Sequence, residues 1–173
     1  MEIGRRLLLA HDSANDNAAR LDRLEFDRRF GLARGRLEAI CGSLIGVSDA
    51  PDVVHDVYLQ ARSRIHQLRD PDALEAWLAR IAINACHSFR RGRQRLTAYP
   101  IAVLEAPGGS DLALRELIER LPPRERTILV LHYGHGYALD EIASLLGINY
   151  ATVRSRIART RIRLFREWTE ADR

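Results

Sequence analysis

Arginine side chains are concentrated between residues 149 and 166, in the stretch NYATVRSRIARTRIRLFR. Each guanidinium is a planar, permanently charged donor that fits phosphate oxygens and the O6/N7 edge of guanine. If the stretch is helical, two explanations are open: a solvated face that is basic by composition, or a surface that binds a polyanion. The side chains expected to be exposed as donors are Thr152, Arg154, Ser155, Arg156 and Arg159.

The residues before this stretch predict how it is positioned. YALDEIASLLG has the spacing of a helix, Gly147 allows a tight turn, and Asn149 is a good N-cap for a second helix. Small Ala143 stands where the two helices must approach closely. This is the pattern of a helix-turn-helix, whose second helix enters the major groove, and it favours the polyanion explanation. The apolar positions that would pack the two helices are Ile142, Leu145, Leu146, Ile148, Val153 and Ile157.

A second group of interest is Trp77, Arg80 and Asn84, which share one helix face at positions i, i+3 and i+7. Trp77 is either a core residue or an aromatic that positions a nucleic acid, and a tryptophan at helical spacing is more often core. Asn84 is mid-helix between apolar neighbours, where an amide is hard to place in a core. The basic run RRGRQR at 90–95 would bind phosphates.

Chemistry of other kinds finds little support in the sequence. His132 and His135 could share a metal at i, i+3, but no carboxylate or thiolate stands at ligand spacing, so zinc is not expected. Cys41 and Cys86 lie in apolar helical patterns and are expected to be buried free thiols. No nucleophile–base pair, phosphate loop or paired carboxylates are evident. We therefore expect no enzyme, no cofactor and no metal.

Helical periodicity runs through most of the 173 residues, and we predict an all-α protein of two small domains joined by a flexible linker. The net charge is +4 and every one of the 27 basic residues is arginine, which suits a polyanionic partner. No apolar run is long enough to insert in a membrane, and the N-terminus lacks a signal-peptide core, so a cytoplasmic location is expected. The predicted parts are a mobile arm at 1–20, a first domain at 21–95, a linker at 96–110 and a second domain at 111–168.

The first of the predicted helices begins after residue 21 and would stop at Gly46. Its core face is expected to carry Leu24, Phe30, Leu37, Ile40 and Leu44.

Two long segments resemble a known family. LPPRERTILVLHYGHGYALDEIASLLGINYATVRSRIARTRIRLFR is similar to region 4 of bacterial RNA polymerase sigma factors. DAPDVVHDVYLQARSRI followed by AWLARIAINACHSFRR resembles their region 2. Both segments occur in the order of the family, with only a linker between them. That layout is typical of the extracytoplasmic-function (group IV) sigma factors.

The resemblance implies an alternative sigma factor that binds core RNA polymerase and directs promoter-specific initiation. Region 2 would bind the clamp helices of the largest subunit and melt the minus-ten element, while region 4 would read the minus-thirty-five element. Contact with the flap of the second-largest subunit and a cognate anti-sigma factor are also implied. The matching minus-ten positions are Trp77, Arg80, Asn84, Arg90, Arg91 and Arg93, the minus-thirty-five positions are Thr152, Arg154, Ser155, Arg156 and Arg159, and the core-binding positions are Asp52, Val53, Val54, His55, Asp56 and Leu59.

This chain departs from the family pattern at two places in region 4. Ala158 replaces a larger residue that faces DNA in many relatives, so no known promoter sequence can be transferred. Ala138 replaces the usual Ser or Thr cap, and Asp140 is the expected substitute. The competing hypothesis is a one-component helix-turn-helix regulator that acts without core polymerase; it would need a ligand pocket or a dimer face in the first domain.

Overall fold

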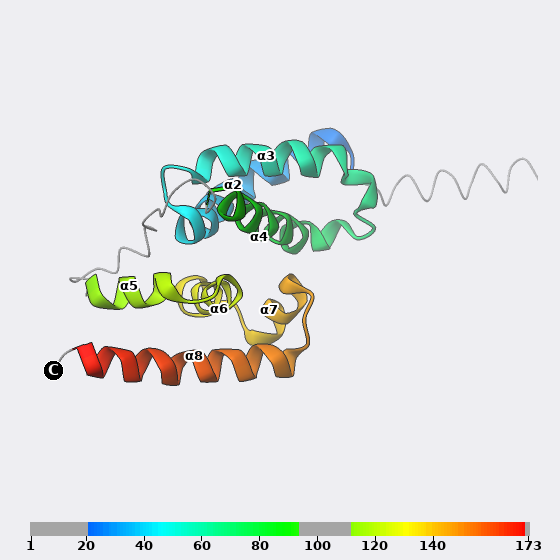
Figure 1. The fold of residues 1–173 in the computed structure, drawn as a ribbon. Helices are drawn as coiled ribbons and strands as arrows, with labels where there is room; N and C mark the ends of the chain where they lie inside the picture. Colours follow the sequence, from blue (N-terminus) through cyan, green and yellow to red (C-terminus); the bar gives the residue numbers. More distant parts are fainter. Residues whose placement is uncertain (1–20, 94–111, 172–173) are drawn as a thin grey trace, which may run out of the picture.

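The computed structural model describes residues 21–93 and 112–171, and the predicted arm at 1–20 and linker at 96–110 lie outside the described residues. Figure 1 shows the described helices in two layers, α2 to α4 in one and α5 to α8 in the other. The described ranges contain no strand, which confirms the all-α prediction. The α-helices are α2 (Arg23–Ile45), α3 (Ala50–Ser63), α4 (Leu74–Arg93), α5 (Leu112–Arg120), α6 (Pro123–Leu129), α7 (Leu139–Leu146) and α8 (Tyr150–Ala171), with short 3₁₀ turns η1 (Ile65–Gln67) and η2 (Pro71–Ala73) and a π-helical turn η3 (Val130–Gly134).

Helices α2, α3 and α4 pack against one another around an apolar core. Gly46, with φ +105°, ends α2 as predicted, because a side chain is strained in that conformation. The prediction that Leu24 belongs to the core is wrong, since this side chain is 84% exposed. Phe26 takes the inward position instead, four residues before Phe30 and one helical turn away.

The predicted helix-turn-helix is formed by α7 and α8. Gly147 adopts the left-handed conformation with φ +64°, and the Ile148 amide donates to the Ala143 carbonyl at 3.0 Å. Asn149 caps α8, because its Oδ1 accepts from the Ala151 amide at 2.7 Å. Four of the predicted packing residues are buried: Ile142, Leu145, Val153 and Ile157.

One detail of the helix-turn-helix differs from the expectation. Asp140 was expected to replace the missing cap at Ala138, but the Ala138 amide donates to Glu141 Oε2 at 2.7 Å. Glu141 occupies the third helical position, from which a long carboxylate reaches back to the cap residue. Asp140 precedes Glu141 by one residue and has a shorter side chain.

Replacing Asn149 with alanine should lower the free energy of unfolding by about 1 kcal/mol, because the first turn of α8 loses its side-chain acceptor. Urea unfolding followed by circular dichroism measures this change. Asn149→Asp should restore most of the loss. Asn84→Ala is the matched control: Asn84 is exposed within α4, where alanine is the better helix former, so stability should not fall. Equal losses from both alanine variants would contradict the capping role.

The two domains pack together in this structure. One continuous cluster of buried residues includes Phe26, Ile40 and Leu78 of the first domain and Ile128, Leu131 and Ile142 of the second. Helix α4 contacts α7, and α2 contacts η3. A smaller cluster, made by Leu117, Ile118, Leu121, Leu129 and Leu164, joins α5 to α8 away from this boundary. We call the packed state of the two domains the closed arrangement.

Candidate nucleic-acid interface

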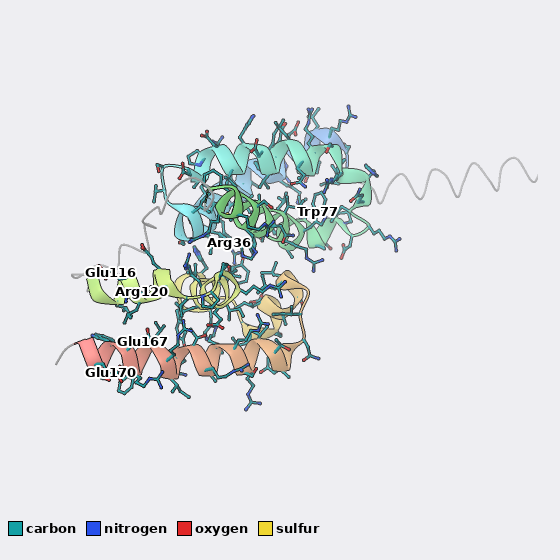
Figure 2. All side chains as sticks on the ribbon, in the orientation of Figure 1. Arg36, Trp77, Glu116, Arg120, Glu167 and Glu170 are labelled. Carbon is teal, nitrogen blue, oxygen red and sulfur yellow. The ribbon has the colours of Figure 1, made fainter. Side chains whose placement is uncertain are left out.

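The N-terminal half of α8 carries the side chains predicted to read DNA. Arg154, Ser155 and Arg159 are exposed, whereas Thr152 and Arg156 are half-buried. Arg159 Nε donates to the Ser155 carbonyl at 3.2 Å, so its guanidinium lies along the helix surface. Acidic residues follow only at the other end of α8, at Glu167 and Glu170, which Figure 2 labels. The helix therefore presents a basic N-terminal half directly after the turn, as major-groove recognition requires.

The second predicted group lies on α4. Trp77 is half-buried and packs against the core cluster, and it also lines a cavity of about 570 Å³ between the two domains. Both explanations of Trp77 are thus compatible with its position. Asn84 is exposed, as expected for a polar reader. Arg80 is exposed too, but its guanidinium donates to the Ser144 carbonyl of α7. In the closed arrangement the second domain therefore occupies part of this surface.

The arginines of the predicted phosphate-binding run at 90–95 differ in exposure and in their hydrogen bonds. Arg90 is half-buried, and its Nη1 donates to the Leu44 carbonyl at 2.9 Å near the end of α2. Burial lowers the Arg90 pKa. One donor of Arg90 therefore holds the first domain together, and its predicted contact with DNA phosphates stays a prediction. Arg91 is exposed and donates to Ser88 Oγ at 2.9 Å. The side chain of Arg93 is not among those that the structure describes.

The predicted core-binding set on α3 divides into two groups. Val53 and Val54 are 4% and 1% exposed and belong to the core of the first domain, so they cannot contact a partner directly. Their place in the apolar series at 50, 53, 54, 57 and 61 already indicated an inward face. The remaining positions lie at i, i+3, i+4 and i+7 on one exposed face of α3: Asp52, His55, Asp56 and Leu59.

The two histidines considered as metal ligands turn to different partners. His132 Nδ1 donates to the Tyr137 carbonyl at 2.8 Å, while His135 Nε2 lies 3.1 Å from Ser43 Oγ in the other domain. Across the described ranges, no three His, Cys, Asp or Glu side chains gather as a metal site. Cys41 and Cys86 are buried, and hydrogen bonding to Cys41 together with burial raises the pKa of Cys86. Such a thiol is unreactive.

Contacts across the domain boundary include two histidines. His87 Nε2 lies 2.9 Å from Thr127 Oγ1, and that hydroxyl donates to the Pro123 carbonyl, so the imidazole is the donor. By the same reasoning His135 donates to Ser43, whose hydroxyl donates to Ala39. Burial lowers the pKa of both histidines. Both are therefore neutral donors at pH 7.

Arginines add to the same boundary. The Arg36 guanidinium lies 4.8 Å from the centre of the Tyr137 ring, a cation–π contact, and Figure 2 shows Arg36 on the side of the first domain that faces the second. The two hydrogen-bonded pairs, His87 with Thr127 and His135 with Ser43, are 40 and 92 positions apart in the sequence. No local sequence pattern therefore predicts these contacts.

The fold and the site define a class: a two-domain helical protein that binds duplex DNA through a helix-turn-helix. Comparison with known families identifies it further. The family model for Sigma-70 region 2 matches residues 30–96, and that for Sigma-70 region 4 matches residues 111–164. The chain belongs to the extracytoplasmic-function (ECF) RNA polymerase sigma factors.

Similar proteins agree with this assignment. The ECF RNA polymerase sigma factor SigM of Mycobacterium tuberculosis is 34% identical over 152 residues, covering 84% of this chain and 78% of the relative. The ECF sigma-E factor of Escherichia coli K12 is 26% identical over 147 residues, or 73% and 77% of the two chains.

A solved structure, the sigma factor RpoE of Bartonella quintana in complex with the anti-sigma factor NepR, is also similar. It has a TM-score of 0.68 and 25% identity, and it covers 84% of this chain and 97% of that one. The structure of CnrH in complex with the cytosolic domain of CnrY gives a TM-score of 0.60 at 25% identity, over 91% and 95% of the two chains.

Proposed function

We propose that this protein is an alternative sigma factor that binds core RNA polymerase and directs initiation at promoters with two separate sequence elements. The observation that carries the proposal is the match to both sigma regions, in order, on a chain whose α8 has the exposed basic face of a recognition helix. A one-component regulator finds no support in the comparisons.

The exposed residues of each domain suggest which promoter element that domain contacts. Arg154, Ser155 and Arg159 would contact base edges or phosphates of the minus-thirty-five element, with Thr152 and Arg156 beside them. Asn84 and Arg80, supported by Trp77, would hold the opened minus-ten element. A single-stranded base needs polar contacts and a stacking surface to offset the cost of leaving the duplex. In the run after Asn84, Arg90, Arg91 and Arg93 would contact backbone phosphates.

Partner surfaces follow from exposure. The face of α3 formed by Asp52, His55, Asp56 and Leu59 would bind the clamp helices of the largest polymerase subunit, with Leu59, 52% exposed, as its apolar centre. The second domain would contact the flap of the second-largest subunit. An anti-sigma factor that covers these surfaces is proposed from the similar structure of RpoE, which contains one. No described helix is long and apolar enough to cross a membrane, and we place the protein in the cytoplasm.

In vitro transcription on a library of randomised promoters tests the proposal. Core RNA polymerase plus this protein should initiate from a subset of sequences that share two elements, and core polymerase alone should not. Arg154→Ala should relax the choice at one or two positions of the upstream element, since a bidentate arginine–guanine contact contributes about 1–3 kcal/mol of discrimination. Asn84→Ala should change only the downstream element. Binding of duplex DNA without any initiation would instead favour the one-component regulator.

A further inference from the structure

A second cavity, of about 370 Å³, opens on the domain boundary at the other end of α4. Its walls come from α4, from the N-terminal end of α6 with the residue before it, and from α8. We call it the arginine pocket, and its lining residues are His87, Arg90, Arg91, Pro122, Pro123, Arg124, Glu125 and Arg156. The volume is at the lower end of the range for ligand sites, enough for a small anion rather than an extended organic ligand.

The charge in the arginine pocket is strongly one-sided. Four arginines face a single glutamate, and Glu125 already accepts from Thr160 Oγ1 at 3.4 Å and lies 3.8 Å from Arg163 Nη1. The arginines are close enough to act on His87: after burial, the charges of Arg91, Arg124 and Arg90 lower its pKa. Glu119 also interacts favourably with Arg90, but it does not line the cavity.

Two features suggest that the charges are not simply solvated side chains. Arg90 Nε is buried and has no hydrogen-bond partner, although the Nη1 atom of the same guanidinium is bonded. A buried cationic donor without an acceptor is costly, and the positive charge of the neighbouring arginines adds to that cost, which an anion bound in the cavity would reduce. In addition, the arginines belong to three different helices, so the fold brings them together against their mutual repulsion.

We propose that the arginine pocket is a binding site for a phosphate-bearing anion, contacted by Arg91 of the first domain and by Arg124 and Arg156 of the second. Guanidinium groups bind phosphate oxygens through short, charge-assisted hydrogen bonds. The phosphate can come from two sources: a small soluble anion such as a diphosphate group, or the backbone of duplex DNA. Because a small anion in the pocket joins the two domains, it binds the closed arrangement more tightly than an open one and so favours it.

Calorimetric titration of the full chain with inorganic pyrophosphate, at an ionic strength fixed with sodium chloride, tests the small-anion source. Saturable binding near one equivalent is expected, and Arg124→Gln should weaken it about tenfold or more. Arg124 is the residue of choice because it is exposed and is not among the positions matched to DNA binding. The matched control is Arg64→Gln, which removes the same charge from an exposed residue outside the pocket and should change affinity less than about twofold.

A parallel titration with a short duplex that lacks promoter elements tests the DNA source. If pyrophosphate does not bind but Arg124→Gln weakens duplex binding and lowers its salt dependence by about one ion, the site takes a backbone phosphate. If Arg124→Gln and Arg64→Gln behave alike with both probes, the proposal is wrong and the pocket is a solvated basic surface. The transcription assay above is independent of this outcome, because a sigma factor without an anion pocket would still initiate.

Discussion

Replacing Arg126 with methionine should lower the free energy of unfolding by about 3 kcal/mol or more, because several buried carbonyls lose charged donors at once. Arg126 is only 3% exposed, and its guanidinium caps the C-terminal end of α5. Nε donates to the Ile118 carbonyl at 3.0 Å, and Nη2 donates to the Leu121 carbonyl at 3.0 Å and also to the Glu119 carbonyl. Methionine keeps the apolar stem but offers no donor.

The charge of Arg126 is retained at neutral pH. Burial lowers its pKa to about 10, still well above 7, and the carbonyl oxygens around it favour the protonated form. Urea unfolding at pH 7 measures the loss. Arg120→Met is the control, since Arg120 is an exposed arginine of α5 whose ion pair with Glu116 is solvated, and it should change stability by less than about 0.5 kcal/mol. Similar losses for the two variants would mean that Arg126 contributes no more than a surface arginine.

Local patterns were sufficient to predict the helix-turn-helix. Gly147 adopts a conformation that favours glycine, Asn149 accepts the hydrogen bond that an N-cap must accept, and Val153 lies at the spacing that a packed helix requires. Each of these features depends on residues within a few positions of one another, so the sequence alone contains them. The positions of Val53 and Val54 were equally predictable from periodicity. Both valines were nevertheless predicted to bind core polymerase, because the whole family motif was matched to this segment without regard to its periodicity.

Contacts that depend on a turn or on the packing of separate helices could not be predicted in this way. Arg126 sits in a charged stretch that predicts exposure, and only the turn between α5 and α6 brings it under the carbonyls of α5. The same holds for Arg90, which reaches the Leu44 carbonyl 46 positions away. The arginine pocket and the closed arrangement combine residues of both domains, and no pattern in either domain implies them.

The second prediction concerns the closed arrangement and its effect on transcription initiation. Two promoter elements separated along a duplex must be bound by two domains at a matching distance, yet here α4 packs on α7 and Arg80 is bonded to the Ser144 carbonyl. If promoter binding requires the domains to separate, the closed state competes with it. The apparent affinity is then reduced by the fraction of molecules that are open. A covalent link that removes the open state should therefore abolish initiation.

Ala76→Cys combined with Ser144→Cys provides such a link. Both positions are exposed and line the 570 Å³ cavity from opposite domains, so a bifunctional methanethiosulfonate with a spacer matched to their separation is the linking reagent. Cys41 and Cys86 should not react, because both are fully buried and the Cys86 pKa is raised. Treatment should reduce promoter-specific transcription to the level of core polymerase alone, and reduction with dithiothreitol should restore it.

The two single-cysteine variants, treated with the same reagent, separate the effect of the link from that of modification. Each should keep its activity, because neither side chain is among the positions matched to DNA or polymerase. Core-polymerase binding, measured by co-purification, adds a further distinction: the exposed face of α3 stays accessible in the closed arrangement, so the linked protein should still bind core polymerase while failing to initiate. Full initiation by the linked protein would show that the closed arrangement is itself competent to bind a promoter.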